Sequence, residues 1–226
     1  MKDNQQQNNT AADAPFRIRI RFAKKGDKKY LSHHDLMRFF ERAIRRAGLP
    51  VRMSRGYNPR PKFSIAAALG VGIAAENEIL DIEFDERLSP EVVRNRLADR
   101  MPPGIEINQA EALPRKGARV SAAWYEVTMP GKAEITSQAI DTLLEQDEVY
   151  VERTAKDRDV RRINIRPHIL EIQKRGSTLR LHLAISANGA ARPEEVIAVL
   201  AGSNPIDFRE LEIVRTTLET EPDQQT

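Results

Sequence analysis

The stretch FRIRIRF, residues 16–22, alternates without exception between apolar and cationic side chains. Successive side chains of a β-strand point to opposite faces of a sheet, so the phenylalanines and isoleucines share one face and the three arginines share the other. The stretch therefore predicts a half-buried strand with a core on one side and a charged surface on the other.

The elements that follow this strand have a regular order. A helix is predicted from Ser32, which can cap it in a capping-box pattern with Asp35, to a stop at Gly48 and Pro50. Its apolar face is expected to contain Leu36, Phe40, Ala43, Ile44 and Ala47. Strand, strand, helix and strand are then predicted within residues 51–66, 78–84, 89–101 and 104–113. The order β-α-β-β-α-β is that of a split β-α-β unit.

The same order recurs in the second half of the chain. Strand, helix and strand are predicted at residues 122–129, 136–146 and 149–155, then a hairpin at 163–173 and 178–186, a helix at 192–201 and a strand at 208–216. The fold prediction is therefore α+β, with two tandem ferredoxin-like (split β-α-β) units, each with an antiparallel sheet. The predicted boundaries are a disordered tail at 1–14, a first unit at 15–114, a connector at 115–120, a second unit at 121–217 and a disordered tail at 218–226.

Composition excludes several classes of protein. The 226 residues include no cysteine, which rules out disulfides, thiolate metal sites, a cysteine nucleophile and an iron–sulfur cluster ligated by this chain. The longest apolar run, FSIAAALGVGIAA, has 13 residues, whereas a membrane span needs about 20. No HxxxH or HExxH spacing occurs, so no metal site is expected, and glycine-rich phosphate motifs are absent, so no cofactor is expected either. A cytoplasmic protein without a membrane partner is expected.

Positive charge is concentrated near the N-terminus. Residues 17–62 carry 15 Lys and Arg against three Asp and Glu, a local charge of +12 in a chain whose net charge is +3. The rest of the chain must therefore carry −9. Such an asymmetry is typical of a surface that binds nucleic acid or an acidic partner.

Two neighbouring segments carry most of this charge. The predicted helix after Ser32 has arginines on its polar side, and Glu41 can pair with only one of them at i, i+4. The stretch SRGYNPRPK, residues 54–62, is stiffened by two prolines and presents arginine for phosphate, tyrosine for stacking and asparagine for a base edge. The predicted RNA-binding residues are Arg38, Arg42, Arg45, Arg46, Arg55, Tyr57, Asn58, Arg60 and Lys62. The alternative is a rigid turn in which Tyr57 packs inward and Asn58 caps backbone groups.

The outer face of the first predicted strand favours a structural role instead. Its arginines, Arg17, Arg19 and Arg21, lie next to Asp81 and Glu83 if the strands of a split β-α-β unit are neighbours. Cross-strand ion pairs are therefore predicted there, rather than the base-stacking aromatics of the common RNA-recognition motif.

The segment YLSHHDLMRFFERAIRRAGLPVRMSRGYNPRPKFSIAAALGVGIAAENEILDIEF, residues 30–84, resembles the radical SAM-linked proteins, a bacterial domain family of unknown function. INIRPHI and ARPEEVIAVL in the second half are similar to its later motifs. The resemblance implies a stand-alone partner of a radical SAM enzyme, in a setting of RNA metabolism. The positions that match the family pattern are Ser32, His33, Asp35, Arg38, Arg42, Gly56, Asn58, Pro59, Arg60 and Pro61, whereas His34 departs from it.

Three functional hypotheses follow. The first is an RNA-binding accessory protein that presents tRNA or rRNA to a radical SAM enzyme. The second is a subunit that docks its basic face on an acidic surface of that enzyme without contacting RNA. The third is a metal-independent endoribonuclease in which His33 and His34 are the candidate catalytic residues, because the histidine pKa lies near neutrality. A non-catalytic partner is favoured, and a secondary groove between the two units is predicted at Arg166, His168 and Arg192.

Overall fold

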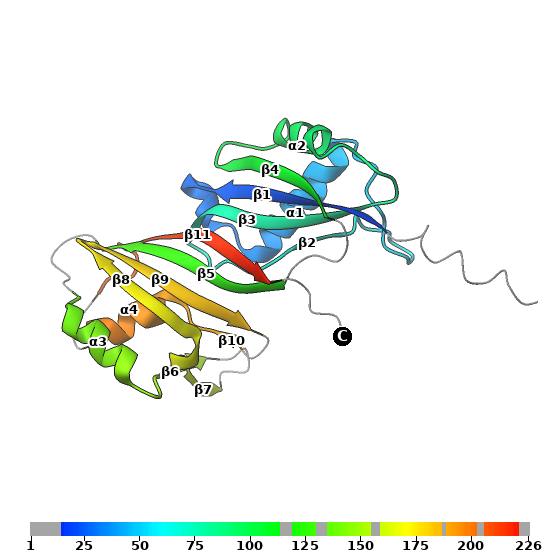
Figure 1. Cartoon of the computed structure of the whole chain (residues 1–226). Coiled ribbons are helices and arrows are strands. Elements are labelled where there is room, and N and C mark those ends of the chain that lie inside the picture. Colours follow the sequence, from blue (N-terminus) through cyan, green and yellow to red (C-terminus); the bar gives the residue numbers. More distant parts are fainter. Residues whose placement is uncertain are drawn as a thin grey trace, which may run out of the picture.

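The computed structural model describes residues 15–113, 119–129, 135–154, 159–186, 189–202 and 206–221. Within these residues the protein is α+β, with four α-helices and a mostly antiparallel sheet (Figure 1). The predicted N-terminal tail, residues 1–14, lies outside the described residues.

The first half contains the elements predicted for it. In chain order these are β1 (Phe16–Lys24), a 3-10 helix η1 (Gly26–Tyr30), α1 (His33–Arg46), β2 (Phe63–Ile65), β3 (Ala74–Phe84), α2 (Pro90–Ala98) and β4 (Ile105–Leu113). The strands lie in the order β4-β1-β3, with β2 paired to the second half of β3. All of these pairings are antiparallel.

Strand β1 has the two faces that its alternation predicts. Ile18, Ile20 and Phe22 are fully buried on the helix side, where they pack against α1 and α2. On the other face Arg17 donates to Glu83 at 2.6 Å, and Arg19 forms two bonds to Asp81, each 2.8 Å long. The predicted cross-strand ion pairs are therefore confirmed at these two arginines.

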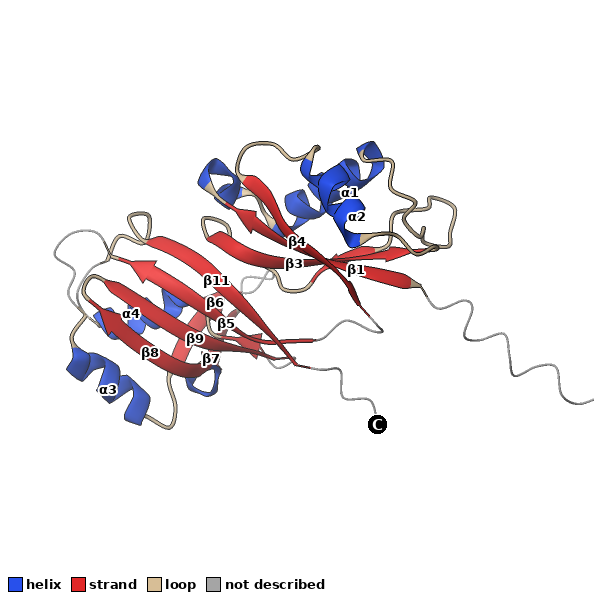
Figure 2. Ribbon diagram, turned by 45° about the horizontal axis from the view of Figure 1, so that its top comes forward, coloured by secondary structure: helices blue, strands red, loops and turns tan. Residues whose placement is uncertain are grey.

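The second half contains the remaining elements. They are β5 (Arg119–Thr128), α3 (Ser137–Glu145), β6 (Tyr150–Thr154), β7 (Val160–Asn164), a 3-10 helix η2 (Arg166–His168), β8 (Ile169–Arg175), β9 (Thr178–Ser186), β10 (Gly189–Ala190), α4 (Pro193–Ala201) and β11 (Glu212–Glu221). Strands β8, β9, β5 and β11 lie side by side in this order, while β6 and β7 form a separate two-stranded sheet. Figure 2 shows α1 and α2 beside the strands of the first half, and α3 and α4 beside those of the second.

The strands of the two halves form one sheet, rather than the two sheets that were predicted. Strand β11 pairs in parallel with the start of β3, through Val214 and Ala74 and through Arg215 and Ala75. The described hydrophobic core of the second half accordingly includes Leu69 and Ile73, which precede β3, and Ile79, in the middle of β3. The chain of the first half thus contributes side chains to the core of the second.

Three other predictions need correction. Strand β5 begins at Arg119, within the predicted connector, and β11 continues to Glu221, within the predicted C-terminal tail. Residues 115–118 of the predicted connector lie outside the described residues. The predicted strand 163–173 is interrupted by η2, because Pro167 has no N–H to donate to a ladder. The strand predicted at residues 149–155 is β6, which pairs only with β7, outside the main sheet. These two strands form a small hairpin in addition to the four strands of a split β-α-β unit.

Candidate nucleic-acid interface

Helix α1 begins as its sequence predicts. The Oγ of Ser32 accepts the backbone N–H of Asp35 at 3.2 Å and donates to the Asp35 carboxylate at 2.6 Å. This hydrogen bond from Ser32 lowers the pKa of Asp35, and the nearby charge of Arg38 lowers it further. Leu36, Phe40, Ala43 and Ile44 are buried on one side of the helix. Burying a large apolar side chain stabilises the fold by about 1.5–3 kcal/mol. This gain fixes which side of α1 packs inward, and the opposite side therefore faces the solvent.

The solvent-facing side of α1 is a basic ridge, which we define as Arg38, Arg42, Arg45 and Arg46. All four side chains are exposed. Arg45 lies 3.3 Å from Glu41 and donates a second bond to the carbonyl of Pro59 at 3.4 Å. Arg38, Arg42 and Arg46 form no ion pair with any residue in the described part of the chain. The ridge therefore presents uncompensated guanidinium groups.

The segment 54–62 is a closed loop beside this ridge. Ser54 and Arg60 close it with two bonds, from Ser54 N–H to the Arg60 carbonyl at 2.8 Å and from Arg60 N–H to the Ser54 Oγ at 3.0 Å. Below them Lys62 N–H donates to the Arg52 carbonyl at 2.8 Å, and Gly56 turns the chain at φ +150°. The loop is thus held at its base, while Arg45 ties it to α1.

The tip of this loop points into solvent. Tyr57 is fully exposed at 100%, so the alternative in which it packs inward is wrong. Arg55, Asn58 and Arg60 are exposed as well, and within the described residues their side chains form no hydrogen bond or ion pair. Lys62 is half-buried, with its Nζ 3.9 Å from the Glu83 carboxylate.

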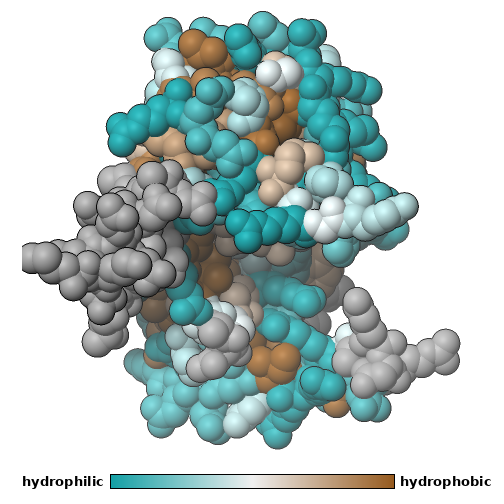
Figure 3. Space-filling view, turned by 90° about the vertical axis from the view of Figure 1, so that its right-hand side faces the viewer, coloured by the Kyte–Doolittle hydropathy of each residue, from teal (hydrophilic) through white to brown (hydrophobic). Residues whose placement is uncertain are grey.

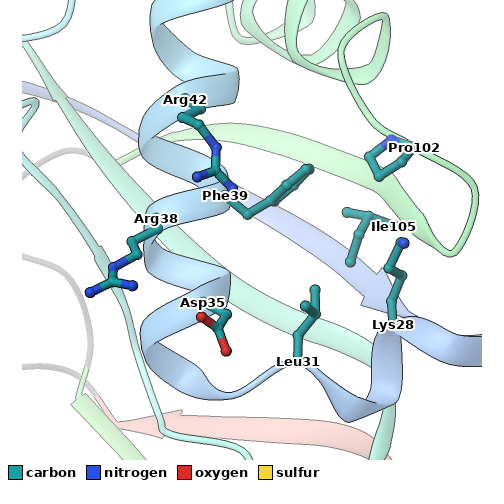
Figure 4. Close-up of a pocket in the computed structure, with 8 residues that line it drawn as sticks. All are labelled: Lys28, Leu31, Asp35, Arg38, Phe39, Arg42, Pro102 and Ile105. Atoms are coloured by element: carbon teal, nitrogen blue, oxygen red, sulfur yellow. The ribbon is translucent and has the colours of Figure 1, made fainter.

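A cavity of about 300 Å³ opens on the other side of the ridge (Figure 4). Its lining comes from η1 and the residue after it, from α1, and from the start of β4 and the loop before it. It consists of Lys28, Leu31, Asp35, Arg38, Phe39, Arg42, Pro102 and Ile105. Sequence reasoning assigned Arg38 and Arg42 to a site but gave no role to Phe39 or Pro102. The available signal was the spacing of Asp35, Phe39 and Arg42, which places them on one side of a helix.

The 3-10 helix η1, which carries Lys28 at the edge of the cavity, is held in place by close packing. Lys25 N–H donates to the Gly104 carbonyl at 2.8 Å, and a Cβ at Gly104 would lie 2.8 Å from the Cγ of Lys28. Lys24 is 1% exposed, and its Nζ donates to the carbonyls of Lys29 at 3.1 Å and Leu31 at 3.4 Å. Burial lowers the pKa of Lys24 to about 8. The position of η1 is therefore set from both sides.

The two candidate catalytic histidines lie at the start of α1. Their ring centroids are 6.2 Å apart, and His33 is half-buried while His34 is exposed. Burial lowers the pKa of His33, and the neighbouring His34 lowers it further. The assignment of either ring to catalysis stays a prediction.

Arg166, His168 and Arg192, the predicted secondary groove, all lie in the second half. The Arg166 guanidinium donates to the carbonyls of Leu144 at 2.7 Å and Ile169 at 2.9 Å, so it binds the end of α3 to the start of β8. Arg192 caps α4 and lies 3.8 Å from Glu195, while His168 is half-buried. Figure 3 shows a recess between the two halves on the face that it displays. The placement of these three residues in that recess stays a prediction.

Neither a metal cluster nor a membrane span is found in the described part of the chain. No group of three or more His, Asp or Glu side chains there is arranged to hold a metal ion. No helix among the described residues is both long and apolar enough to cross a bilayer.

Comparison with known proteins gives a family and no more. The family model described as "Uncharacterized protein conserved in bacteria (DUF2344)" matches residues 17–205. No curated protein matches the sequence. One similar solved structure is titled "Crystal Structure of a Cbf5-Nop10-Gar1 Complex", with 11% identity over 92% of this chain and a TM-score of 0.43. This chain spans about half of that matched chain, 49%, and a likeness at this level carries no functional argument.

Proposed function

The chain belongs to the DUF2344 family of bacterial proteins, and from the geometry of its basic ridge we propose that it is an RNA-binding accessory protein. Its RNA is a tRNA or an rRNA, bound across the basic ridge and the loop at residues 54–62. The protein presents this RNA to a radical SAM enzyme, a partner that the sequence resemblance suggests.

One observation carries the proposal. Five exposed arginines, Arg38, Arg42, Arg46, Arg55 and Arg60, have no ion pair with any described residue, and the tyrosine of the loop, Tyr57, is fully exposed. Arginine recognises phosphate oxygens in bidentate geometry, and tyrosine stacks on unpaired bases. The bond from Arg45 to Pro59 holds the two elements together, so little conformational entropy is lost when both bind one ligand.

We propose a finer description of the fold as well. Each half has the strand order expected of a ferredoxin-like unit, β4-β1-β3-β2 in the first and β11-β5-β9-β8 in the second. The β6–β7 hairpin is an insertion in the second unit. The parallel contact between β11 and β3 then joins two tandem units edge to edge.

A salt titration with fluorescently labelled tRNA and with a single-stranded RNA tests the function. If the five arginines each neutralise one phosphate, the logarithm of the association constant for the single strand should fall with log[salt] at a slope of about −3.5. The control is Arg175→Ala, an exposed arginine at the last position of β8, which should leave the slope unchanged. Absence of binding at low salt, or a slope near zero, would overturn the proposal.

The two rival functions are outcomes of related experiments. Crosslinking in cells, followed by identification of bound RNA and co-purifying proteins, tests the radical SAM partner. Recovery of that enzyme without RNA, if Arg38→Glu abolishes the recovery, would favour the protein-docking subunit. Cleavage of RNA in EDTA, abolished by His33→Ala or His34→Ala, would favour the endoribonuclease.

A further inference from the structure

The cavity beside the basic ridge has a charge that suits one kind of ligand. The charged residues of its lining are Lys28, Arg38, Arg42 and Asp35, with a net charge of +2, and Figure 4 shows the Arg38 side chain directed to the opposite side of Asp35 from Lys28. A phosphomonoester carries about −1.5 to −2 at neutral pH, whereas each internal phosphodiester of an RNA carries only −1. The lining therefore matches a terminal phosphate better than a phosphate within the chain.

The rest of the lining is apolar and excludes a bare phosphate as the full ligand. Leu31, Phe39, Pro102 and Ile105 form this part, with the Phe39 ring supported edge-on by Phe40 at a centroid distance of 5.4 Å. A cavity of about 300 Å³ is at the small end of the range found for small-molecule sites, about 300–1,000 Å³. The occupant should therefore have a flat apolar body of modest size attached to its phosphate, which describes a single nucleotide.

Asp35 adds a reason to expect a ribonucleotide. The hydrogen bond from Ser32 lowers the pKa of its carboxyl, so the group is ionised near neutral pH and accepts hydrogen bonds. A carboxylate in an otherwise cationic cavity repels phosphate, but it can accept hydrogen bonds from ribose hydroxyls, as acidic residues do in dinucleotide-binding sites. A deoxyribose end offers one such hydroxyl fewer.

The cavity also connects to the proposed RNA path. At 100° per residue, Phe39 and Arg45 project about 120° apart on α1, with Arg38 and Arg42 between them. Phe39 lines the cavity and Arg45 contacts the loop at Pro59. A strand whose end occupied the cavity would cross Arg38 and Arg42 to reach Tyr57.

We propose that this cavity binds one ribonucleotide through its phosphomonoester, either as the phosphorylated end of an RNA strand or as a free mononucleotide. The proposal rests on the RNA-binding function and deepens it by naming the part of the RNA that is held. Lys28 and Arg42 bind the phosphate, Phe39 contacts the base, and Asp35 accepts from the ribose.

Fluorescence anisotropy with four probes tests it. The probes are one 8-nucleotide RNA with a 5′-phosphate, with a 3′-phosphate or with both ends as hydroxyls, and the phosphorylated DNA of the same sequence, each with its dye inside the strand. Either the 5′-phosphate or the 3′-phosphate RNA should bind about tenfold tighter than the RNA with two hydroxyl ends. Tenfold corresponds to about 1.4 kcal/mol of binding free energy, which the charge-assisted contacts to the phosphate would supply. Calorimetry with AMP and with adenosine gives the corresponding comparison for free ligands, and AMP should bind the tighter.

Variants test whether the preference for a phosphorylated RNA end arises in the cavity. Lys28→Ala and Phe39→Ala should remove the tenfold preference for the phosphorylated end. Asp35→Asn should reduce the preference for RNA over DNA at that end. Tyr57→Ala, at the loop, should weaken every strand alike and leave the ratio between ends unchanged. Arg175→Ala, in the second half, is the matched control for charge and should change neither quantity.

The outcomes separate this inference from the function on which it rests. Equal affinity for phosphorylated and hydroxyl RNA, with no binding of AMP, would overturn the cavity site and leave RNA binding intact. Binding of AMP without binding of any strand would support the cavity and overturn the RNA-binding function. Failure of every probe to bind would overturn both.

Discussion

The outer face of β1 and the exposed face of α1 both carry arginines, but carboxylates pair with more of the first set. Arg21 has no ion pair among the described residues, and Arg45 of the basic ridge pairs with Glu41. Arg17 and Arg19 are paired with Glu83 and Asp81 across the sheet, whereas Arg38 and Arg42 have no ion pair in the described part of the chain. In a sheet, register places residues from distant sequence positions directly opposite one another. On a helix surface the local partners are three or four residues away, and α1 has only Asp35 and Glu41 as acids.

This comparison shows why the number of basic residues is a poor guide to a binding surface. The two sets have the same chemistry and belong to the same half of the molecule. Their difference is the location of carboxylates, and only uncompensated cations are available to a polyanion. The following predictions test this difference, from the largest expected effect to the smallest.

The largest effect is expected at a buried ion pair, that of Arg215 and Glu78. Arg215 donates to Glu78 at 2.7 Å through its Nε and again through a terminal nitrogen, and both side chains are 1% exposed. Burial opposes the charge of Arg215, but the Glu78 carboxylate raises its pKa above the usual value. Glu78→Gln should lower the free energy of unfolding by about 3–5 kcal/mol, because it leaves a buried charge unpaired.

Urea denaturation followed by circular dichroism measures this loss. Glu76→Gln, an exposed carboxylate on the same strand, is the control and should change stability by less than about 0.5 kcal/mol. An equally small effect of Glu78→Gln would show that the pair is dispensable for joining β11 to β3.

The next largest effect is expected at the tip of the loop. Tyr57→Ala should weaken binding of single-stranded RNA by about 1–3 kcal/mol, the usual contribution of one base–aromatic stack. Because the side chain is fully exposed, the melting temperature should not change. Tyr57→Phe keeps the ring and should bind as the original protein does, and equal losses in both variants would contradict stacking.

A smaller effect concerns a buried cation that is partnered by carbonyl groups. Burial lowers the pKa of Lys24 to about 8, which the charge of Glu78 counteracts and that of Arg215 reinforces. Between pH 8 and the usual lysine value near 10.5, the unfolded chain binds more protons than the folded one, so stability must rise with pH.

The difference in unfolding free energy between the original protein and Lys24→Met isolates this contribution. It should shift in favour of the original protein by roughly 1 kcal/mol between pH 7 and pH 9. A difference that does not vary with pH would mean that Lys24 titrates normally.

The smallest effect compares single arginines from the two sets directly. Arg38→Ala should weaken binding of single-stranded RNA a few-fold and make the salt slope shallower by about 0.7, because one phosphate no longer has an arginine to neutralise it. Arg17→Ala should leave both quantities unchanged, since its charge is already matched by Glu83. Anisotropy titrations at several salt concentrations measure both, and equal losses in the two variants would remove the distinction between the sets.

Much of the local structure was predictable, because its causes are local. Ser32 and Asp35 form the predicted cap, Gly48 follows the helix at φ +60°, and the predicted apolar side of α1 is the buried one. The cross-strand pairs were also predictable once β1 and β3 were taken as neighbours. The exposure of Tyr57 was not, since stiffness alone does not decide whether a loop packs inward or outward.

The junction of the halves and the cavity were not predictable for a different reason. The cavity joins Lys28 and Phe39 to Pro102 and Ile105, and nothing near Phe39 in the sequence distinguishes it from a core residue. The β11–β3 contact depends on two pairs of residues about 140 positions apart. The available signal was Arg215 at an inward position of its strand, which demanded a buried partner without identifying it.

The amino-acid sequence by itself determined the order of the elements, the start and end of α1, and a concentration of positive charge within residues 17–62. Periodicity and capping act over a few residues, so they can be recognised without the fold. Only the tertiary structure decided which arginines meet carboxylates, how the two halves share one sheet, and where a cavity opens beside the basic ridge. Those outcomes depend on contacts between distant segments, which form only when the whole chain is packed.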